Sequence, residues 1–196
     1  MDSGGKPPFE NCSAPAPERS LYANAPLELI KLKEQGWCEV ALPEALFDID
    51  FPGHYMRRIR SVSLSIPAVV GPYTGINCTL TLLRDQTRIK NTLADGYAER
   101  VGEEDDRFLT SWTRMQSVAM SNAQNDSGMF ELNFRDERYL PFEGAGVISR
   151  WRIELPQTFR QFSYDTISDV VLHIKYTARD GGVPLREAAI GNLRQS

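Results

Sequence analysis

The sequence is poor in the residues from which catalytic and metal sites are most often built. It contains three cysteines, Cys12, Cys38 and Cys78, and two histidines, His54 and His173. No two cysteines stand at a CxxC spacing, and a zinc site needs about four nitrogen, sulfur or oxygen ligands, so we expect no structural zinc. Three cysteines cannot all pair within one chain. We favour buried or idle free thiols, with one disulfide as the open alternative.

Long hydrophobic runs and an excess of positive charge are also missing. No apolar run approaches the roughly 18 residues that a membrane-spanning helix requires. Lys and Arg number 22 against 26 Asp and Glu, which gives a formal net charge of -4. This mild acidity argues against general binding to nucleic acid or to anionic membranes, because both need clustered positive charge. With 41% hydrophobic and 24% charged residues, the composition is that of an ordinary globular protein.

The first 20 residues differ in composition from the rest. Four prolines and two glycines in this stretch predict a flexible tail or linker over 1–20, and we expect a single domain over 21–196. A short helix should follow the tail, capped by Asn24, with Pro26 in its first turn and Gly36 at its end. Its expected apolar side consists of Leu27, Leu29, Ile30 and Leu32.

From Trp37 onward, apolar and polar residues alternate with the period of β-strands. The ranges that we expect to be strands are 37–42, 61–66, 76–82, 129–134, 151–155 and 170–176, with one or two more in 108–121. A brief turn or helix should run from Pro43 to Phe47, and a short helix from Leu185 to Leu193. Residues 84–107 are predicted to form a long polar surface loop, with a helical piece around 97–101. The predicted fold is therefore mainly β, an antiparallel β-sandwich with a short N-terminal helix and small peripheral helices.

A search for catalytic patterns yields little. His54 falls in a turn before a strand, and His173 lies on a strand face opposite Leu172 and Ile174. Either is conceivable as a general base, but a histidine that stabilises a turn or lies on the surface is commoner. The sequence has no GxSxG or HExxH motif, and the glycine-bearing segment 71–75 lacks the GK[ST] of a phosphate-binding loop. We therefore predict no catalytic, cofactor-binding or metal-binding residues, and a cryptic hydrolase built on His54 is the least favoured interpretation.

Two stretches combine arginine, carboxylate and aromatic residues. One contains Arg57, Arg58 and Arg60, and the other runs from Phe134 to Gly146. Arginine and aromatic side chains are preferred anchors of protein interfaces, whereas the structural alternative for both stretches is an internal network of ion pairs. The partner-binding residues that we predict are Arg57, Arg58, Arg135, Asp136, Glu137, Arg138, Tyr139, Phe142 and Glu143.

Several long strings occur in an order that resembles one protein family. They are Phe51–Ile59, Val70–Gly75, Ser121–Leu132, Phe134–Gly146 and Tyr164–Asp169. The sequence is similar, over roughly residues 25–190, to the C-terminal, B-component-binding domain of the A component (TcA) of bacterial insecticidal toxin complexes.

The resemblance implies a role without catalysis. In that family, A components assemble as pentameric, pore-forming and receptor-binding subunits, and this domain docks the β-propeller of the cocoon-shaped B–C component. Docking opens the propeller gate, and the toxic fragment passes into the channel. The implied partners are thus the B component and other A-component protomers, with no nucleic acid and no direct membrane contact. The implied location is a secreted, extracellular toxin complex of a bacterium.

A second interpretation from a different class is a carbohydrate-binding β-sandwich that acts at a host cell surface. Sandwich modules often bind sugars on exposed aromatic platforms. The candidate platforms here are Trp37, Trp112 and Trp151, although Trp151 has the strand parity of a core residue.

Overall fold

The computed structural model describes residues 12–13, 18–69, 76–93, 96–100, 102, 104–111, 116–122, 129–132, 142–158, 160 and 162–195. For residues 12–13, 18, 116–122 and 129–132 it describes the backbone alone. None of the helices in these ranges is both long and apolar enough to cross a membrane.

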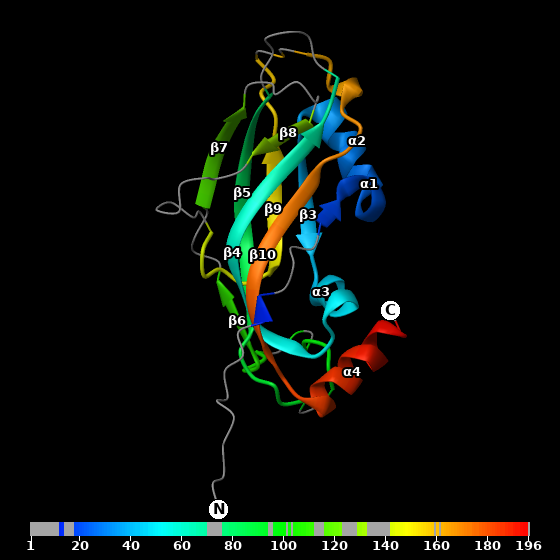
Figure 1. The fold of residues 1–196 in the computed structure, drawn as a ribbon, viewed down its shortest axis with the longest axis vertical. Coiled ribbons are helices and arrows are strands. Elements are labelled where there is room, and N and C mark those ends of the chain that lie inside the picture. The colour runs from blue at the N-terminus through cyan, green and yellow to red at the C-terminus, as the bar shows by residue number, and fades with distance from the viewer. Residues whose placement is uncertain are drawn as a thin grey trace, which may run out of the picture.

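Ten strands and a few short helices make up the described chain (Figure 1). The strands are β1 (Cys12–Ser13), β2 (Glu18–Ser20), β3 (Trp37–Leu42), β4 (His54–Pro67), β5 (Ile76–Arg88), β6 (Phe108–Ser111), β7 (Gln116–Asn122), β8 (Met129–Leu132), β9 (Ile148–Glu154) and β10 (Val171–Asp180). The helices are α1 (Leu21–Asn24), α2 (Pro26–Gln35), α3 (Glu44–Asp50), the 3-10 turn η1 (Tyr164–Thr166) and α4 (Val183–Leu193).

The strands form two antiparallel sheets. In the first, β10 pairs with β1 and β2 on one side and with β4 on the other, and β4 then pairs with β8. In the second, β9 lies between β3 and β5, and β5 also pairs with β6 and β7. Side chains from both sheets join one buried hydrophobic cluster between them. The predicted antiparallel β-sandwich with small peripheral helices is therefore confirmed.

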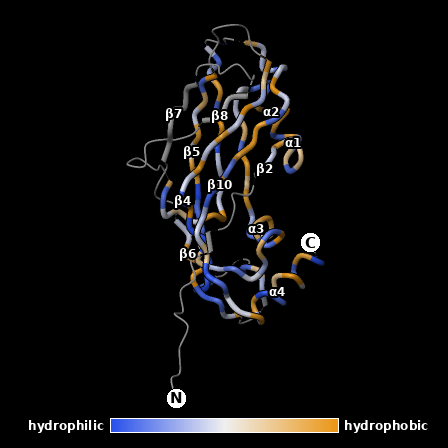
Figure 2. The backbone as a smooth tube through the Cα atoms, viewed as in Figure 1, coloured by the Kyte–Doolittle hydropathy of each residue, from blue (hydrophilic) through white to orange (hydrophobic). Residues whose placement is uncertain are grey.

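Alternation along the strands produces this core, and a β-bulge in β4 changes its phase. Orange and blue residues follow one another along the strands in Figure 2. Val62, Leu64 and Ile66 face the core in the upper part of β4, but Ile59 also faces it. The register shifts between Ile59 and Ser61, which leaves Arg60 as the extra residue. A bulge inserts one extra residue into the strand. On the N-terminal side of Arg60, the side chains that face the core therefore have odd residue numbers. This shift turns Arg57 into the interior and Arg58 outward.

Helix α2 ends where the sequence predicts, but its N-cap and its exposed face differ from the prediction. Gly36 ends the helix with φ +76, a left-handed conformation that glycine adopts without a steric penalty. The N-cap is Ala25, not Asn24, because Leu21–Asn24 already form the separate turn α1. Leu29 is buried, whereas Leu27 is 71% exposed. Ile30 is also 49% exposed, so the expected apolar side is only half buried.

Two further parts of the described chain contain more regular or buried structure than expected from the sequence. Within the predicted flexible tail, β1 and β2 pair with β10, because that edge of the first sheet offers unpaired backbone groups to short extended segments. The predicted surface loop 84–107 is not all loop, since β5 continues to Arg88. Arg88, Asp105 and Arg107 are buried, and no helix occurs in the described residues 96–100.

Gly146 is a point of close approach between backbones. A Cβ atom at this position would lie 2.1 Å from the carbonyl oxygen of Gln86. We expect Gly146→Ala to lower the free energy of unfolding by about 1–3 kcal/mol, because main-chain atoms must move apart. Gly191→Ala on α4 is the matched control, since a Cβ there meets nothing within 4 Å. It should instead stabilise the helix by about 0.5–1 kcal/mol. Equal melting temperatures for the two variants would contradict this assignment.

Cys38 and Cys78 are buried free thiols, as favoured from the sequence. Burial raises the pKa of each thiol to about 12. Above about pH 9 the unfolded chain loses these protons while the folded chain keeps them. The free energy of unfolding should therefore fall with rising pH, by roughly 1.4 kcal/mol per pH unit for each thiol. Urea unfolding at about pH 8.5 and about pH 10 measures the slope. In a Cys38→Ala/Cys78→Ala variant, the free energy of unfolding should fall clearly less steeply with pH.

Candidate docking surface

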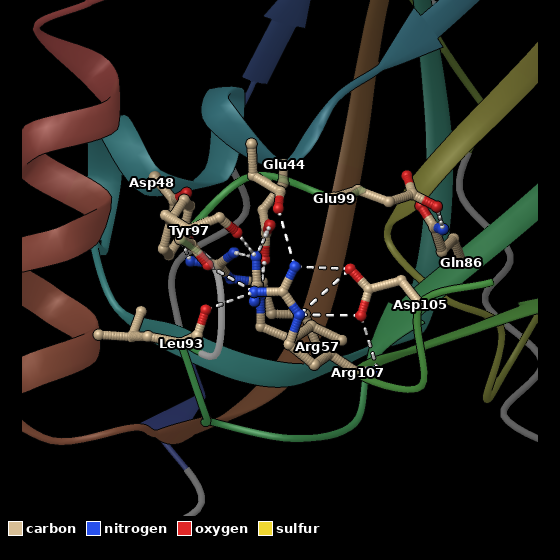
Figure 3. A network of polar contacts seen from close by, with 12 residues as sticks. Glu44, Asp48, Arg57, Gln86, Leu93, Tyr97, Glu99, Asp105 and Arg107 are labelled. Carbon is tan, nitrogen blue, oxygen red and sulfur yellow. Dashed lines mark hydrogen bonds and ion pairs between the residues drawn. The ribbon is translucent and has the colours of Figure 1, made fainter. Parts of the chain in front are cut away.

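A buried network of charged side chains joins α3 to the ends of β4 and β5 (Figure 3). Arg57 of β4 donates to the Asp48 carboxylate at 2.6 Å and to the Phe51 carbonyl at 2.8 Å. Arg88 of β5 donates twice to the Glu44 carboxylate, at 2.8 and 2.7 Å. Both carboxylates belong to the short helix α3. The network thus fixes this helix against the first and the second sheet at once.

Tyr97 extends the network to the polar segment after β5. Its hydroxyl donates to Asp48 at 2.5 Å, and its carbonyl accepts from Arg88 at 2.7 Å. The guanidinium of Arg88 also lies 4.5 Å from the centre of the Tyr97 ring. Burial raises the pKa of Tyr97, so the phenol stays protonated and remains a donor.

Arg107 organises the same segment from its other end. It donates to Asp105 with its Nε at 2.8 Å and one terminal nitrogen at 2.6 Å. Its guanidinium also donates to the carbonyls of Leu93, Gly96 and Ala98. These side-chain hydrogen bonds from Arg107 hold the pKa of Asp105 below its ordinary value. A single guanidinium therefore supplies several of the hydrogen bonds that hold this segment, which has no regular secondary structure in its described residues.

This network is suited to support and not to catalysis. Each carboxylate is already held by an arginine, and the gap between Glu44, Arg57 and Arg88 has a volume of about 0 Å³. A substrate has no room beside these groups. Among the described residues, no three His, Cys, Asp or Glu side chains are grouped so as to hold a metal ion.

A serine and a histidine do lie together on the outer side of the first sheet. Ser65 Oγ and His173 Nε2 are 2.8 Å apart, the distance expected of a nucleophile and its base. However, Ser65 lies within β4, which pairs with β10 on one side and β8 on the other. The sheet ladders use the backbone amides around Ser65, so they do not converge on an oxyanion. The pair of Ser65 and His173 therefore lacks the oxyanion-binding amides that an acyl-transfer site needs.

His54, the other candidate base, opens β4 and stacks on Phe51, with the ring centres 5.7 Å apart. Burial, together with the positive charge of Arg57, lowers its pKa. Its Nδ1 atom is buried without a partner among the described residues. Arg57 lies near it, and no hydroxyl group is bonded to it among the described residues, so His54 has no nucleophile there for which it could act as a base.

The structure brings parts of the two predicted docking stretches side by side. Ile59 N–H donates to the Ala145 carbonyl at 2.8 Å, and Arg58 forms a bridge with Gly146. Arg57 and Phe142 point inward, with 3% and 1% exposure. Phe142 packs edge-on against Trp151, with ring centres 4.8 Å apart. These two side chains therefore support the surface from below, because a buried side chain presents no contact area to a partner.

Arg58 and Glu143 are the exposed members of the predicted set. The remaining members, Arg135, Asp136, Glu137, Arg138 and Tyr139, lie outside the described residues. For these five, a docking role stays a prediction.

Exposed cations gather on the outer face of the first sheet. Arg58 and Arg60 come from β4, and Lys175 from β10. None of the three forms an ion pair within the described part of the chain. The sequence prediction missed Lys175, although its place opposite the inward residues Ile174 and Tyr176 was a usable signal. The three residues, called the basic face below, give a locally positive surface to an acidic chain.

Neither of the two tryptophans that the structure describes offers a free aromatic platform of the kind a sugar-binding module uses. Trp151 is fully buried, and its indole N–H donates to Ser149 Oγ at 2.8 Å. Trp37 is 38% exposed, but the Arg152 guanidinium lies 4.7 Å from the centre of its ring. Trp112 lies outside the described residues.

The Arg57–Asp48 pair gives a test of the network. We expect Arg57→Met to lower the free energy of unfolding by about 3–5 kcal/mol, because it leaves the buried Asp48 carboxylate without its cation. Arg58→Met, one residue along the same strand but exposed, should change stability by no more than about 0.5 kcal/mol. Urea unfolding of both variants measures the difference. Comparable losses at the two positions would mean that the buried ion pair is not what stabilises this end of the sandwich.

The chain is similar to several known proteins. The family model described as the Tc toxin complex TcA C-terminal TcB-binding domain matches residues 17–178. The chain is 39% identical over 159 residues to Toxin subunit YenA2 of Yersinia entomophaga, a match that covers 80% of this chain and 12% of that protein. The cryo-EM structure of Yersinia pseudotuberculosis TcaA-TcaB is similar at 30% identity, with a TM-score of 0.43, over 73% of this chain and 7% of that one.

The chain thus spans only a small part of the length of these relatives. Within that part, the family match runs from β2 into β10 and so includes nine of the ten strands, from both sheets of the sandwich. The chain belongs to the family of C-terminal TcB-binding domains of TcA, the A component of Tc toxin complexes.

Proposed function

We propose that this chain acts without catalysis, as the part of an A component that docks the β-propeller of the B–C cocoon. In this proposal, docking favours the open propeller gate and so helps the toxic fragment to enter the A-component channel. The chain acts within a secreted, extracellular bacterial toxin complex. The observation that carries the proposal is the family match over residues 17–178.

The basic face supplies a physical reason for docking. Exposed cations without ion pairs create a positive potential that attracts an acidic partner surface and raises the rate of association. We assign Arg58, Arg60 and Lys175 to this encounter, with Glu143 at the neighbouring turn 142–145. The segment that contains Arg135, Asp136, Glu137, Arg138 and Tyr139 leads into that turn, so we propose that it extends the same contact surface.

Gating adds a thermodynamic requirement. The domain shifts the propeller towards its open state only if it binds that state more tightly than the closed one. In a pentameric A component, five copies would surround the channel entrance, and each bound copy would raise the effective concentration of its neighbours. We therefore propose that weak contacts by single domains add up to strong capture by the ring.

The basic face provides a test of the proposal. We expect the triple variant Arg58→Ala/Arg60→Ala/Lys175→Ala to bind purified B component roughly tenfold more weakly at low salt, at about 0.5 kcal/mol per cation. The loss should lie mainly in the association rate and should shrink at high salt, because salt screens exposed charges. Surface plasmon resonance at two ionic strengths measures both effects.

The control removes three other exposed cations that lie outside the basic face, Lys31, Lys90 and Arg194. Of these, Lys31 pairs with Glu28 and Lys90 with Asp106. This control variant should bind like the unaltered domain while carrying the same change in net charge. An equal loss in both triple variants would show that net charge, and not the basic face, governs association. Failure of the unaltered domain to bind the B component at all would overturn the proposed function.

A further inference from the structure

Within the described ranges of the chain, one edge of the second sheet carries backbone groups without strand partners. Leu155 N–H donates to the Gly36 carbonyl at 2.7 Å, so Leu155 points towards the β3 side of β9. Residues along an antiparallel strand alternate in the direction of their hydrogen bonds. Ile153, Trp151 and Ser149 therefore bond to β3, through Cys38, Val40 and Leu42 in the observed register. Glu39 and Ala41 must direct their amides and carbonyls away from β9.

The contacts of these two residues agree with that direction. Glu39 N–H has only a long bond, 3.4 Å, to the Glu28 carboxylate of α2. Ala41 is exposed, and its N–H has no acceptor within the described part of the chain. The stretch from Glu39 to Leu42 is thus a short open edge, of the kind to which another strand can add.

Two hollows flank this edge, one on each face of the sheet. The inner hollow has a volume of about 340 Å³, and its apolar lining includes Leu21, Val40, Leu46 and Leu172. The outer hollow has a volume of about 540 Å³ and a more polar lining that includes Glu39, Glu99 and Arg150. Both hollows are lined by Ala41, Leu42 and Pro43, so the C-terminal end of β3 separates one hollow from the other.

The inner hollow also contains a buried donor without an acceptor. Arg19 Nε has no hydrogen-bond partner among the described residues, although the side chain is only 13% exposed. The charge of Arg19 is already compensated by Asp50 at 2.8 Å. A second anion gains little beside a compensated guanidinium, whereas a neutral carbonyl oxygen satisfies the remaining N–H. Backbone carbonyls of a peptide are acceptors of this kind.

We propose that β3 is a strand-addition site, which receives an extended segment of the B component along Glu39–Leu42. Successive side chains of an added strand point to opposite faces. The segment therefore alternates an apolar side chain, which fills the inner hollow, with an acidic one, which meets Arg150 in the outer hollow. Arg150 fits that role because its side chain is 60% exposed and its Glu39 partner lies 3.7 Å away. This inference rests on the proposed docking of the B component.

A second copy of this chain is a poorer occupant. If two β3 edges paired, the inward side chains of the added strand would be Cys38, Val40 and Leu42 of the other copy. Those side chains are 0–7% exposed in the core of their own domain. Because these side chains already pack in their own core, they cannot enter the hollow of the partner copy. Pairing between two copies would therefore leave the apolar hollow empty.

The substitution Ala41→Pro tests the open edge directly. Proline removes the outward N–H and places a ring in the path of an added strand, yet it is tolerated on a strand edge whose N–H faces solvent. We expect Ala41→Pro to weaken binding of purified B component roughly tenfold, a loss of the size of one main-chain hydrogen bond or slightly more. Ala41→Ser keeps the N–H and should bind like the unaltered domain. Thermal unfolding verifies that both variants are folded.

The inner hollow is tested separately. Ala25 lines it, and Ala23 is exposed on α1 outside that lining. Ala25→Phe should fill the hollow and weaken binding of the B component, whereas Ala23→Phe should not. Amide hydrogen exchange of the unaltered domain supplies a measurement without substitutions, because the Ala41 amide should become protected when the B component is added.

The outcomes separate this inference from the proposed function. If the unaltered domain binds but Ala41→Pro binds equally well and the Ala41 amide stays unprotected, the strand-addition site is wrong and docking stands. If the unaltered domain does not bind the B component, both the strand-addition site and the proposed docking function are wrong. If Ala41 becomes protected with rising domain concentration in the absence of the B component, the occupant is a second copy and the inference is overturned.

Discussion

The ion pair between Arg57 and Asp48 is the interaction that holds together the end of the sandwich where α3 packs. The bulge at Arg60 changes the phase of β4 and sends a guanidinium into the interior, where an unpaired charge would be costly. Asp48 compensates that charge at 2.6 Å, and in doing so it brings α3 against the sheets and orients the Tyr97 hydroxyl. Because β4 carries Arg58 on the opposite face, the same bulge also creates part of the basic face.

The sequence predicted the sheets well and the charged interior badly. Alternation identified β3 (Trp37–Leu42) to the residue and located β9 and β10, whose ends it missed by one to four residues. It succeeded because one face of each strand is buried and the other is not. The network of Glu44, Arg88 and Asp105 had no such signal, since its members are far apart in the chain and occur at no regular spacing. The polar composition of residues 84–107 pointed to solvent, yet paired charges satisfy one another inside the protein.

The residues that were predicted to dock a partner were also foreseen only in part. The family resemblance identified the kind of protein, and an interface composition of arginine and aromatics identified two stretches that the fold places side by side. Which side chains face outward depends on the bulge, and no periodicity reveals a one-residue slip. Consequently Arg57 and Phe142 were predicted at the surface, whereas Lys175 was overlooked. The open edge of β3 is a property of backbone pairing and therefore has no trace in the sequence.

Phe142 has a further consequence for the turn that it begins. Its φ of +71 lies in the left-handed region, which costs a residue with a Cβ of the order of 1 kcal/mol or more. The ring compensates by packing against Trp151 in the middle of the core. The orientation of Glu143 is thus thermodynamically linked to the position of an indole deep inside the molecule. Any rearrangement that displaced Trp151 would release the turn, so the interior and the exposed turn at Glu143 respond as one unit.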